Sequence, residues 1–170
     1  NWDEILLQDI QDKLVITPNQ IERKPSMFGF VIGDFGGVDD FRLDEYLEQE
    51  PSTRSNTLTD NGEIFPFFMQ KKYYMAVGGF DIWYPSPFIC DWDFFLKLEM
   101  IDVKFIRSNK LAFYHFGSMA TKNGSEKDKF NQSEALAAEM FEYKWGFNII
   151  RHPNNSHKPK NIEIKGIKYE

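Results

Sequence analysis

Residues 91–100 form a segment that has to be enclosed by the rest of the protein. Its apolar side chains crowd together over a length typical of one helix, at Trp92, Phe94, Phe95, Leu96 and Leu98. A helix with this much apolar surface is stable only when other elements cover it. The sequence therefore predicts a buried helix here, inside a chain that builds a substantial core.

The composition supports such a core and excludes several classes of function. The chain has 170 residues, which is the size of one domain. Of these residues 42% are apolar and 16% are aromatic, and this composition excludes wholesale disorder. The net charge of −6 argues against binding to nucleic acid, because phosphate neutralisation needs clustered Lys and Arg. It also disfavours a polybasic membrane-surface role.

Alternating apolar runs and helical patterns predict an α/β fold, a mixed sheet with flanking helices. Proline and glycine are expected to punctuate it, with Pro18 ending the first strand and Gly146 ending the last helix. Polar loops are expected at 51–62 and 118–129, and a polar tail at 151–170. The expected strands are 14–17, 27–32, 64–69, 103–106 and 111–114, and the expected helices are 2–13, 44–49, 71–77, 91–100 and 131–145.

The cysteine content and the first residues of the chain give expectations about its location and its extent. Cys90 is the single cysteine, so no disulfide can form within the chain and a reducing, cytoplasmic location is expected. No apolar run approaches the roughly 20 residues of a membrane span. The first residues, Asn1 to Leu7, are typical of the inside of a helix, so we expect a fragment of a longer protein.

Two carboxylates in the aromatic stretch 65–97 are the first candidates for chemistry. Asp91 and Asp93 flank Trp92 at the expected start of a helix. A carboxylate among aromatic rings is costly unless it caps, pairs, binds metal or transfers protons. Asp91 is therefore either the N-cap of this helix or a functional carboxylate.

Three motifs resemble those of family 2 glycosyltransferases. Residues 77–81 (VGGFD) followed by 91–98 (DWDFFLKL) resemble the family pattern GGFDE … EDWDLWLRL. Residues 113–118 (FYHFGS) resemble its strand-ending histidine, and 141–146 (FEYKWG) resemble its F-x-x-KWG helix end. The resemblance covers about residues 60 to 150. It implies that 1–150 is the C-terminal, acceptor-side part of a GT-A fold (nucleotide-diphospho-sugar transferase-like).

The resemblance implies a role for each matching residue. Asp91 matches the general base, which would take a proton from the acceptor hydroxyl during an inverting sugar transfer. Asp93 matches a helix-side acidic position, counted with the substrate-binding residues, that more often orients or caps than reacts. Residues matched to the acceptor site are Gly78, Gly79, Phe80 and Asp81, and rings on which a sugar could stack are Trp83, Tyr84 and Trp92.

The same resemblance implies a metal. His115 matches a position that contacts the Mn²⁺ or Mg²⁺ ion or the donor diphosphate, and a hydrogen-bonded histidine at a strand end is the alternative. The family's metal-binding DxD motif is missing. Asp39 and Asp40 imitate it only superficially, in a polar loop at the wrong place.

Two replacements depart from the family pattern. Cys90 stands in place of a glutamate, and we expect it to pack as a small apolar group. Lys97 stands in place of an arginine, and a lysine cannot make the bidentate hydrogen bonds of a guanidinium group.

The leading hypothesis is a glycosyltransferase that acts on a nucleotide-sugar donor and a glycan or lipid-linked acceptor, here without its donor-binding half and inactive alone. The alternative is a non-catalytic carbohydrate-binding or interaction domain, and a third is that the motif matches are accidental. An enzyme half predicts that Asp81, Asp91 and His115 face one cleft, whereas a binding module predicts an aromatic-lined groove. A sheet edge left open by the missing half predicts a homo-oligomer.

Overall fold

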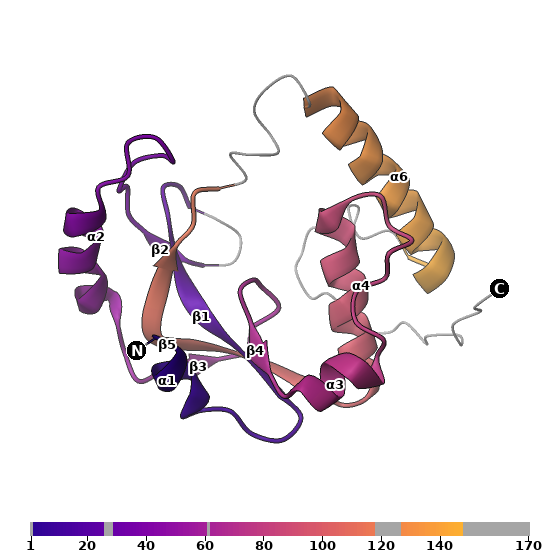
Figure 1. Ribbon diagram of the computed structural model, residues 1–170, viewed down its shortest axis with the longest axis horizontal. Helices are drawn as coiled ribbons and strands as arrows, with labels where there is room; N and C mark the ends of the chain where they lie inside the picture. The colour runs from indigo at the N-terminus through magenta and orange to yellow at the C-terminus, as the bar shows by residue number, and fades with distance from the viewer. Residues whose placement is uncertain (1, 26–28, 61, 118–126, 148–170) are drawn as a thin grey trace. The chain divides into compact units, whose positions relative to one another are not determined.

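The computed structural model describes residues 2–25, 29–60, 62–117 and 127–147, and they form an α/β architecture with a mixed sheet and flanking helices (Figure 1). These residues fall into two compact units. The first contains residues up to Met75 together with the segment from Ile101 to 117, and it holds the whole sheet. The second contains Ala76–Met100 and 127–147. The expected tail, 151–170, lies outside the described residues.

The sheet of the first unit is built around β1 (Leu14–Glu22), which lies parallel to β5 (Lys104–Tyr114) along most of its length. β2 (Val31–Ile32) pairs parallel with the end of β1, and β4 (Phe68–Met69) pairs antiparallel with its beginning. β3 (Leu58–Thr59) pairs antiparallel with the other side of β5.

Two expected strand boundaries are wrong for one physical reason. Pro18 does not end β1, and 103–106 and 111–114 are not separate strands but parts of β5. The register shifts between Pro18 and Asn19, where the partner jumps from Ser108 to Ala112. This bulge accommodates a residue without an N–H donor, so that both strands continue through it.

Other boundaries differ less. The expected strands at 27–32 and 64–69 shrink to two residues each, and 26–28 are not described. The expected loop at 51–62 contains η1 (Glu50–Thr53) and β3. The expected helix at 2–13 ends at residue 7 as α1 (Trp2–Leu7), whereas α2 (Leu43–Gln49) and α3 (Lys71–Ala76) match expectation closely.

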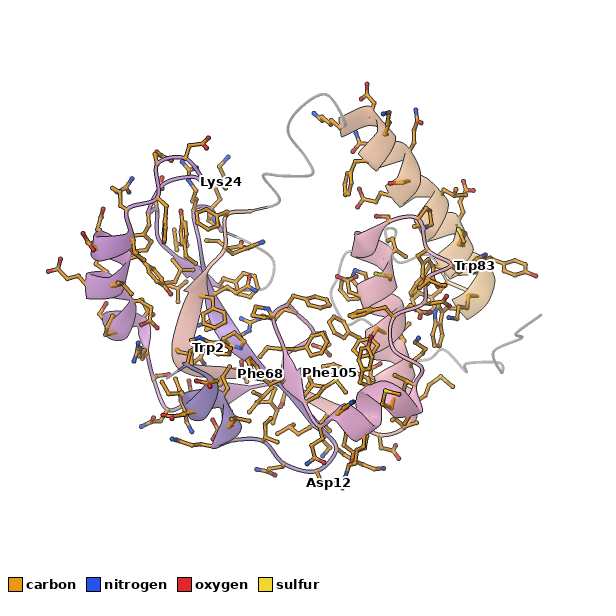
Figure 2. The ribbon with its side chains drawn as sticks, in the orientation of Figure 1. Trp2, Asp12, Lys24, Phe68, Trp83 and Phe105 are labelled. Carbon is orange, nitrogen blue, oxygen red and sulfur yellow. The ribbon has the colours of Figure 1, made fainter. Side chains whose placement is uncertain are left out.

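Apolar clusters lie on both faces of the sheet, because alternate residues of a strand point to opposite sides. On one face Leu6 of α1 packs with Leu14, Ile16 and Leu111, and Trp2 lies against Phe68 with ring centroids 5.3 Å apart (Figure 2). On the other face the buried residues are Ile21, Phe35 and Ala112, with Tyr46 of α2 packed beside them.

The expected homo-oligomer through a partly exposed sheet edge stays a prediction, but the edges of the described sheet are short. In the described part of the chain, β2, β3 and β4 have two residues each, which offers little to another chain. The outer edge of β5 beyond β3 is also occupied. The Ala112 N–H donates to the buried Glu50 carboxylate (2.8 Å), and its carbonyl accepts from the Tyr46 hydroxyl (2.7 Å).

The second unit is two packed helices and the loop before them. α4 (Pro87–Met100) and α6 (Lys127–Trp145) lie side by side (Figure 1) and share a core. That core contains Tyr84, Ile89, Leu96, Ala137, Ala138, Phe141, Trp145 and Phe147. The expected helix end is confirmed, since Gly146 follows α6 with φ of 79° and its N–H bonds to Glu142 O at 2.8 Å.

Candidate functional site

A fully buried carboxylate joins three segments of the second unit. Asp93 on α4 has 0% of its surface exposed. Its Oδ1 accepts hydrogen bonds from the Tyr84 hydroxyl (3.1 Å) and the Trp145 indole N–H (2.8 Å), and it lies 2.7 Å from Lys144 Nζ. Its Oδ2 lies 3.3 Å from Lys97 Nζ, one helical turn further along α4.

The two lysines extend this cluster into the loop before α4. Lys144 Nζ also donates to Asp81 Oδ2 at 2.8 Å, and Lys97 Nζ donates to the Gly79 carbonyl at 2.6 Å. Two carboxylates therefore face two ammonium groups, and the buried charges balance. Such balance is needed, because an unpaired buried charge costs several kcal/mol. We call Asp81, Asp93, Lys97 and Lys144 the ion cluster.

Contacts within the ion cluster favour the charged forms of Asp81 and Lys144. Burial raises the pKa of Asp81, but hydrogen bonds from Lys144 and from the Trp83 N–H outweigh it, so the pKa is lowered overall. Burial lowers the pKa of Lys144, and its bonds to Asp81 and Asp93 outweigh that effect, so its pKa is raised overall. Both shifts favour the ion pairs over their neutral forms.

The backbone conformation of the loop favours glycine at two positions. Gly78 and Gly79 have φ of 74° and 68°, in the left-handed region that side chains with a Cβ rarely adopt. Their conformation turns the chain at the end of α3, so that the Gly79 carbonyl reaches Lys97 and Asp81 reaches Lys144. Nothing lies within 4 Å of a Cβ built on Gly78, so space for an approaching molecule exists there.

Asp91 lies on a different face of α4 from Asp93, because residues two positions apart on a helix point to nearly opposite sides. The helix begins at Pro87, so Asp91 lies in its second turn and the N-cap interpretation is wrong. Its Oδ1 accepts the Trp92 N–H at 2.9 Å. Residues three and four positions further along share its side of the helix, and these are the buried rings Phe94 and Phe95. Burial raises the pKa of Asp91 to about 7.

A partly exposed carboxyl with a pKa near 7 is suited to exchange protons at neutral pH. Cys90 beside it is not, because burial and then the charges of Asp91 and Asp93 raise its pKa to about 11. At neutral pH that thiol is protonated, in agreement with the packing role expected of it.

The predicted aromatic residues divide into packed and exposed rings. Phe80 packs against Phe94 with centroids 4.6 Å apart, and Trp92 lies partly buried against the shared core. Tyr84 is buried and serves the ion cluster. Trp83 is half exposed, and it lies near Tyr143 of α6 with ring centroids 6.4 Å apart.

His115 belongs to the first unit, directly after β5. Its Nδ1 lies 2.6 Å from Glu22 Oε1, and its backbone N–H donates to the Ile21 carbonyl. A carboxylate on one ring nitrogen is the arrangement that orients the other nitrogen of a metal-binding histidine. Within the described residues, however, no three His, Cys, Asp or Glu side chains gather into a group that could hold a metal ion.

The segment that imitates a DxD motif forms an exposed turn. Asp40 Oδ1 accepts the Gly37 N–H at 2.5 Å, and the turn is held to the sheet by the Tyr114 hydroxyl, which donates to the Gly36 carbonyl. Asp40 therefore stabilises its own loop.

The structure brings together three of the four matched segments. Residues 78–81, 91–93 and 144–146 all lie in the second unit, whereas His115 lies in the first. The expectation that Asp81, Asp91 and His115 face one cleft stays a prediction. Asp93 has no exposed surface to offer a substrate, so its position suits the orienting role.

The partners of Asp93 are not predicted by the sequence. Lys144 and Trp145 were not expected at the site, although both contact this carboxylate. The spacing of Asp93 and Lys97, four residues apart on a helix, was a signal of an ion pair. Nothing local in the sequence indicated that the end of α6 would reach them.

Neither a protein-family model, nor a curated protein, nor a solved structure matches this chain. Among the described helices none has the length and apolar character to cross a bilayer.

Proposed function

We propose that the chain is the acceptor-side part of an inverting glycosyltransferase with a GT-A fold. The observation that supports this most is the ion cluster, because it ties together the segments that resemble the family. Asp81, Asp93 and Lys144 come from three separate segments of these motifs, and Lys144 contacts both carboxylates directly. Accidental matches would have no reason to meet around one carboxylate.

Asp91 is the general base in this proposal. With a pKa of about 7 it is ionised in a large fraction of molecules at neutral pH, yet basic enough to take a proton. The acceptor hydroxyl oxygen would form a bond to the anomeric carbon of the donor as its proton passes to Asp91. The bond from that carbon to the nucleoside diphosphate would break, and the diphosphate would leave with the electron pair. Attack from the opposite face would invert the anomeric centre.

A divalent metal, Mn²⁺ or Mg²⁺, belongs to the same proposal only through the family resemblance. His115, oriented by Glu22, would supply one ligand. No step above depends on the metal, since the described residues do not complete its coordination.

A second candidate is a non-catalytic carbohydrate-binding domain. The observation that favours it is the exposure of Trp83 beside Tyr143, because an exposed ring pair binds sugars without any base. The two candidates differ in what they require of Asp91. Only the enzyme needs its carboxylate.

Calorimetric titration with UDP-, GDP- and dTDP-sugars, with and without Mn²⁺, tests the donor side. Metal-dependent binding of one nucleotide-sugar would support an enzyme that carries its own donor site. Binding of a glycan without binding of any nucleotide-sugar would favour the carbohydrate-binding domain.

Transfer assays with the donor that binds would then test the base. The Asp91→Asn variant keeps the shape of the side chain and loses its basicity, so we expect transfer to fall by about 10²–10⁴-fold. In the parent protein kcat should rise with pH and level off above about 7, following ionisation of Asp91. Equal rates for both proteins would remove Asp91 from the mechanism.

A further inference from the structure

Lys97 is a buried lysine of α4 to which the proposed reaction gives no role. Its side chain is 8% exposed, and its ammonium group meets two partners, the Gly79 carbonyl at 2.6 Å and Asp93 Oδ2 at 3.3 Å. A buried ion pair contributes little net stability, because desolvation of the two charges offsets their attraction. An apolar side chain would fill the same space without that cost. The contacts of Lys97 therefore call for a reason beyond stability.

Lys97 holds the first half of the loop at 77–86, which connects α3 to α4. Gly78 and Gly79 turn the chain there in left-handed backbone conformations, and we call these two residues the glycine turn. Gly79 is buried, whereas Gly78 is exposed. The hydrogen bond from Lys97 to the Gly79 carbonyl is charge-assisted and is therefore stronger than a bond between neutral groups. It fixes the glycine turn from its buried side and leaves the exposed side open.

Other contacts hold the second half of the loop. Asp81 pairs with Lys144 at 2.8 Å, and the hydroxyl of the buried Tyr84 donates to Asp93. These contacts lie beyond Phe80, whereas Lys97 holds the glycine turn that precedes it. Loss of the Lys97 ammonium would therefore release the glycine turn and leave the second half of the loop in place.

Phe80 links the glycine turn to the side of α4 that carries Asp91. It follows Gly79 directly, and its ring packs on Phe94 with centroids 4.6 Å apart. Phe94 lies three positions after Asp91, so the two residues share a side of the helix. The position of the glycine turn therefore affects the space beside Asp91, where the acceptor hydroxyl would lie.

We infer that Lys97 is a positioning residue of the proposed transfer reaction, which fixes the glycine turn so that a bound acceptor presents its hydroxyl to Asp91. This inference rests on the proposed function. Lys97 is not a catalytic residue, because its ammonium group is buried against Gly79 and Asp93 and touches no reacting atom. Its effect is geometric, since a displacement of about 1 Å at a reacting group can cost about 10²-fold in rate.

Hydrogen exchange of the full chain, followed by mass spectrometry, tests this contact without any substrate. Lys97→Met keeps the length of the side chain and removes its charge. We expect exchange in the peptide 77–84 to become about ten- to hundredfold faster, the range of one hydrogen bond to a charged group. Exchange in α6 should change little, because Asp93 keeps its contacts with Lys144 and Trp145. Unchanged exchange at 77–84, or equal acceleration in this peptide and in α6, would overturn the inference.

Two further variants make the result specific. Lys97→Arg restores a cation with several N–H donors, so exchange at 77–84 should return toward that of the parent protein. Exchange as fast as in Lys97→Met would mean that the cation does not hold the glycine turn. Lys110→Met is the matched control, since Lys110 is also partly buried and pairs with Asp9 at 2.6 Å, but in the first unit. It should leave exchange at 77–84 unchanged, and faster exchange there would count against a specific role of Lys97.

Kinetics separate this inference from the proposed function. Where transfer is observed, Lys97→Met should lower kcat/KM for the acceptor by about 10²-fold, mainly through a higher acceptor KM, and leave the KM of the nucleotide-sugar unchanged. A simple loss of folded protein would lower kcat and change neither KM, and that result would overturn the inference. Selective release of 77–84 in a chain without transfer activity would support the contact made by Lys97 and count against the enzyme.

Discussion

Asp91 illustrates, at the scale of one residue, how burial shifts a pKa and makes stability depend on pH. Its pKa is about 7 in the folded protein, against 3.8 for an ordinary aspartate. The folded state therefore favours the protonated form. This contribution to stability is complete below pH 3.8 and is lost as the pH rises through 7.

The Asp91→Asn variant should remove that loss. Asparagine stays neutral at every pH, so the variant should gain stability relative to the parent as the pH rises from 4 to 8. After allowance for partial exposure we expect a gain of about 1–2 kcal/mol. Thermal melts at both pH values measure it. A constant difference between the two proteins would show that Asp91 does not titrate in this range.

Lys144 is the residue on which the ion cluster depends most, because it contacts both carboxylates. Lys144→Met keeps the length of the side chain and removes its charge, leaving Asp81 and Asp93 with too little compensation. We expect a loss of about 3–5 kcal/mol in the free energy of unfolding, measured with urea.

Two further proteins control this experiment. Lys72→Met breaks an exposed ion pair with Asp12 and should change stability very little. Adding Asp81→Asn to Lys144→Met removes one unpaired charge and should restore part of the loss. If the double variant were no more stable than Lys144→Met, charge compensation would not explain the effect.

At the scale of one element, Glu50 takes the place of a neighbouring strand along β5. Its Oε1 accepts the Ala112 N–H at 2.8 Å, and its carboxylate is also paired with Arg54. Glu50→Ala leaves this buried N–H without a partner, at a cost of about 1–3 kcal/mol. Glu50→Gln keeps an acceptor oxygen and should lose clearly less. Urea unfolding compares the two, and equal losses would assign the effect to Arg54 alone.

At the scale of the whole molecule, the chain divides into two units with separate cores. Damage to the ion cluster should therefore remain in the second unit. In Lys144→Met we expect faster hydrogen exchange in α4 and α6 and unchanged protection in β1 and β5, as measured by mass spectrometry. A uniform loss of protection across all four elements would mean that the two units unfold together.

Local patterns in the sequence were sufficient for most helices. The bounds of α2 and α3 and the C-terminal end of α6 were predicted closely, the last from Gly146, because such signals act over a few residues. The starts of α4 and α6 were wrong, since these helices begin at Pro87 and Lys127 and not at the expected 91 and 131. The α/β class and the buried character of α4 follow from composition and apolar density in the same way. The unusual setting of Asp91, a carboxylate among aromatic rings, was also visible from its neighbours alone, while its role stays a prediction.

Only the tertiary structure decided what depends on distant partners. Pro18 lies within a strand because a bulge against β5, about 90 residues away, accommodates it. Asp93 is a buried anion because Lys144 and Trp145 reach it from α6. Trp83 and Tyr143 meet for the same reason. Strand pairing and ion pairing between remote segments leave no periodic trace in a sequence, so local spacing could predict the elements and not the contacts between them.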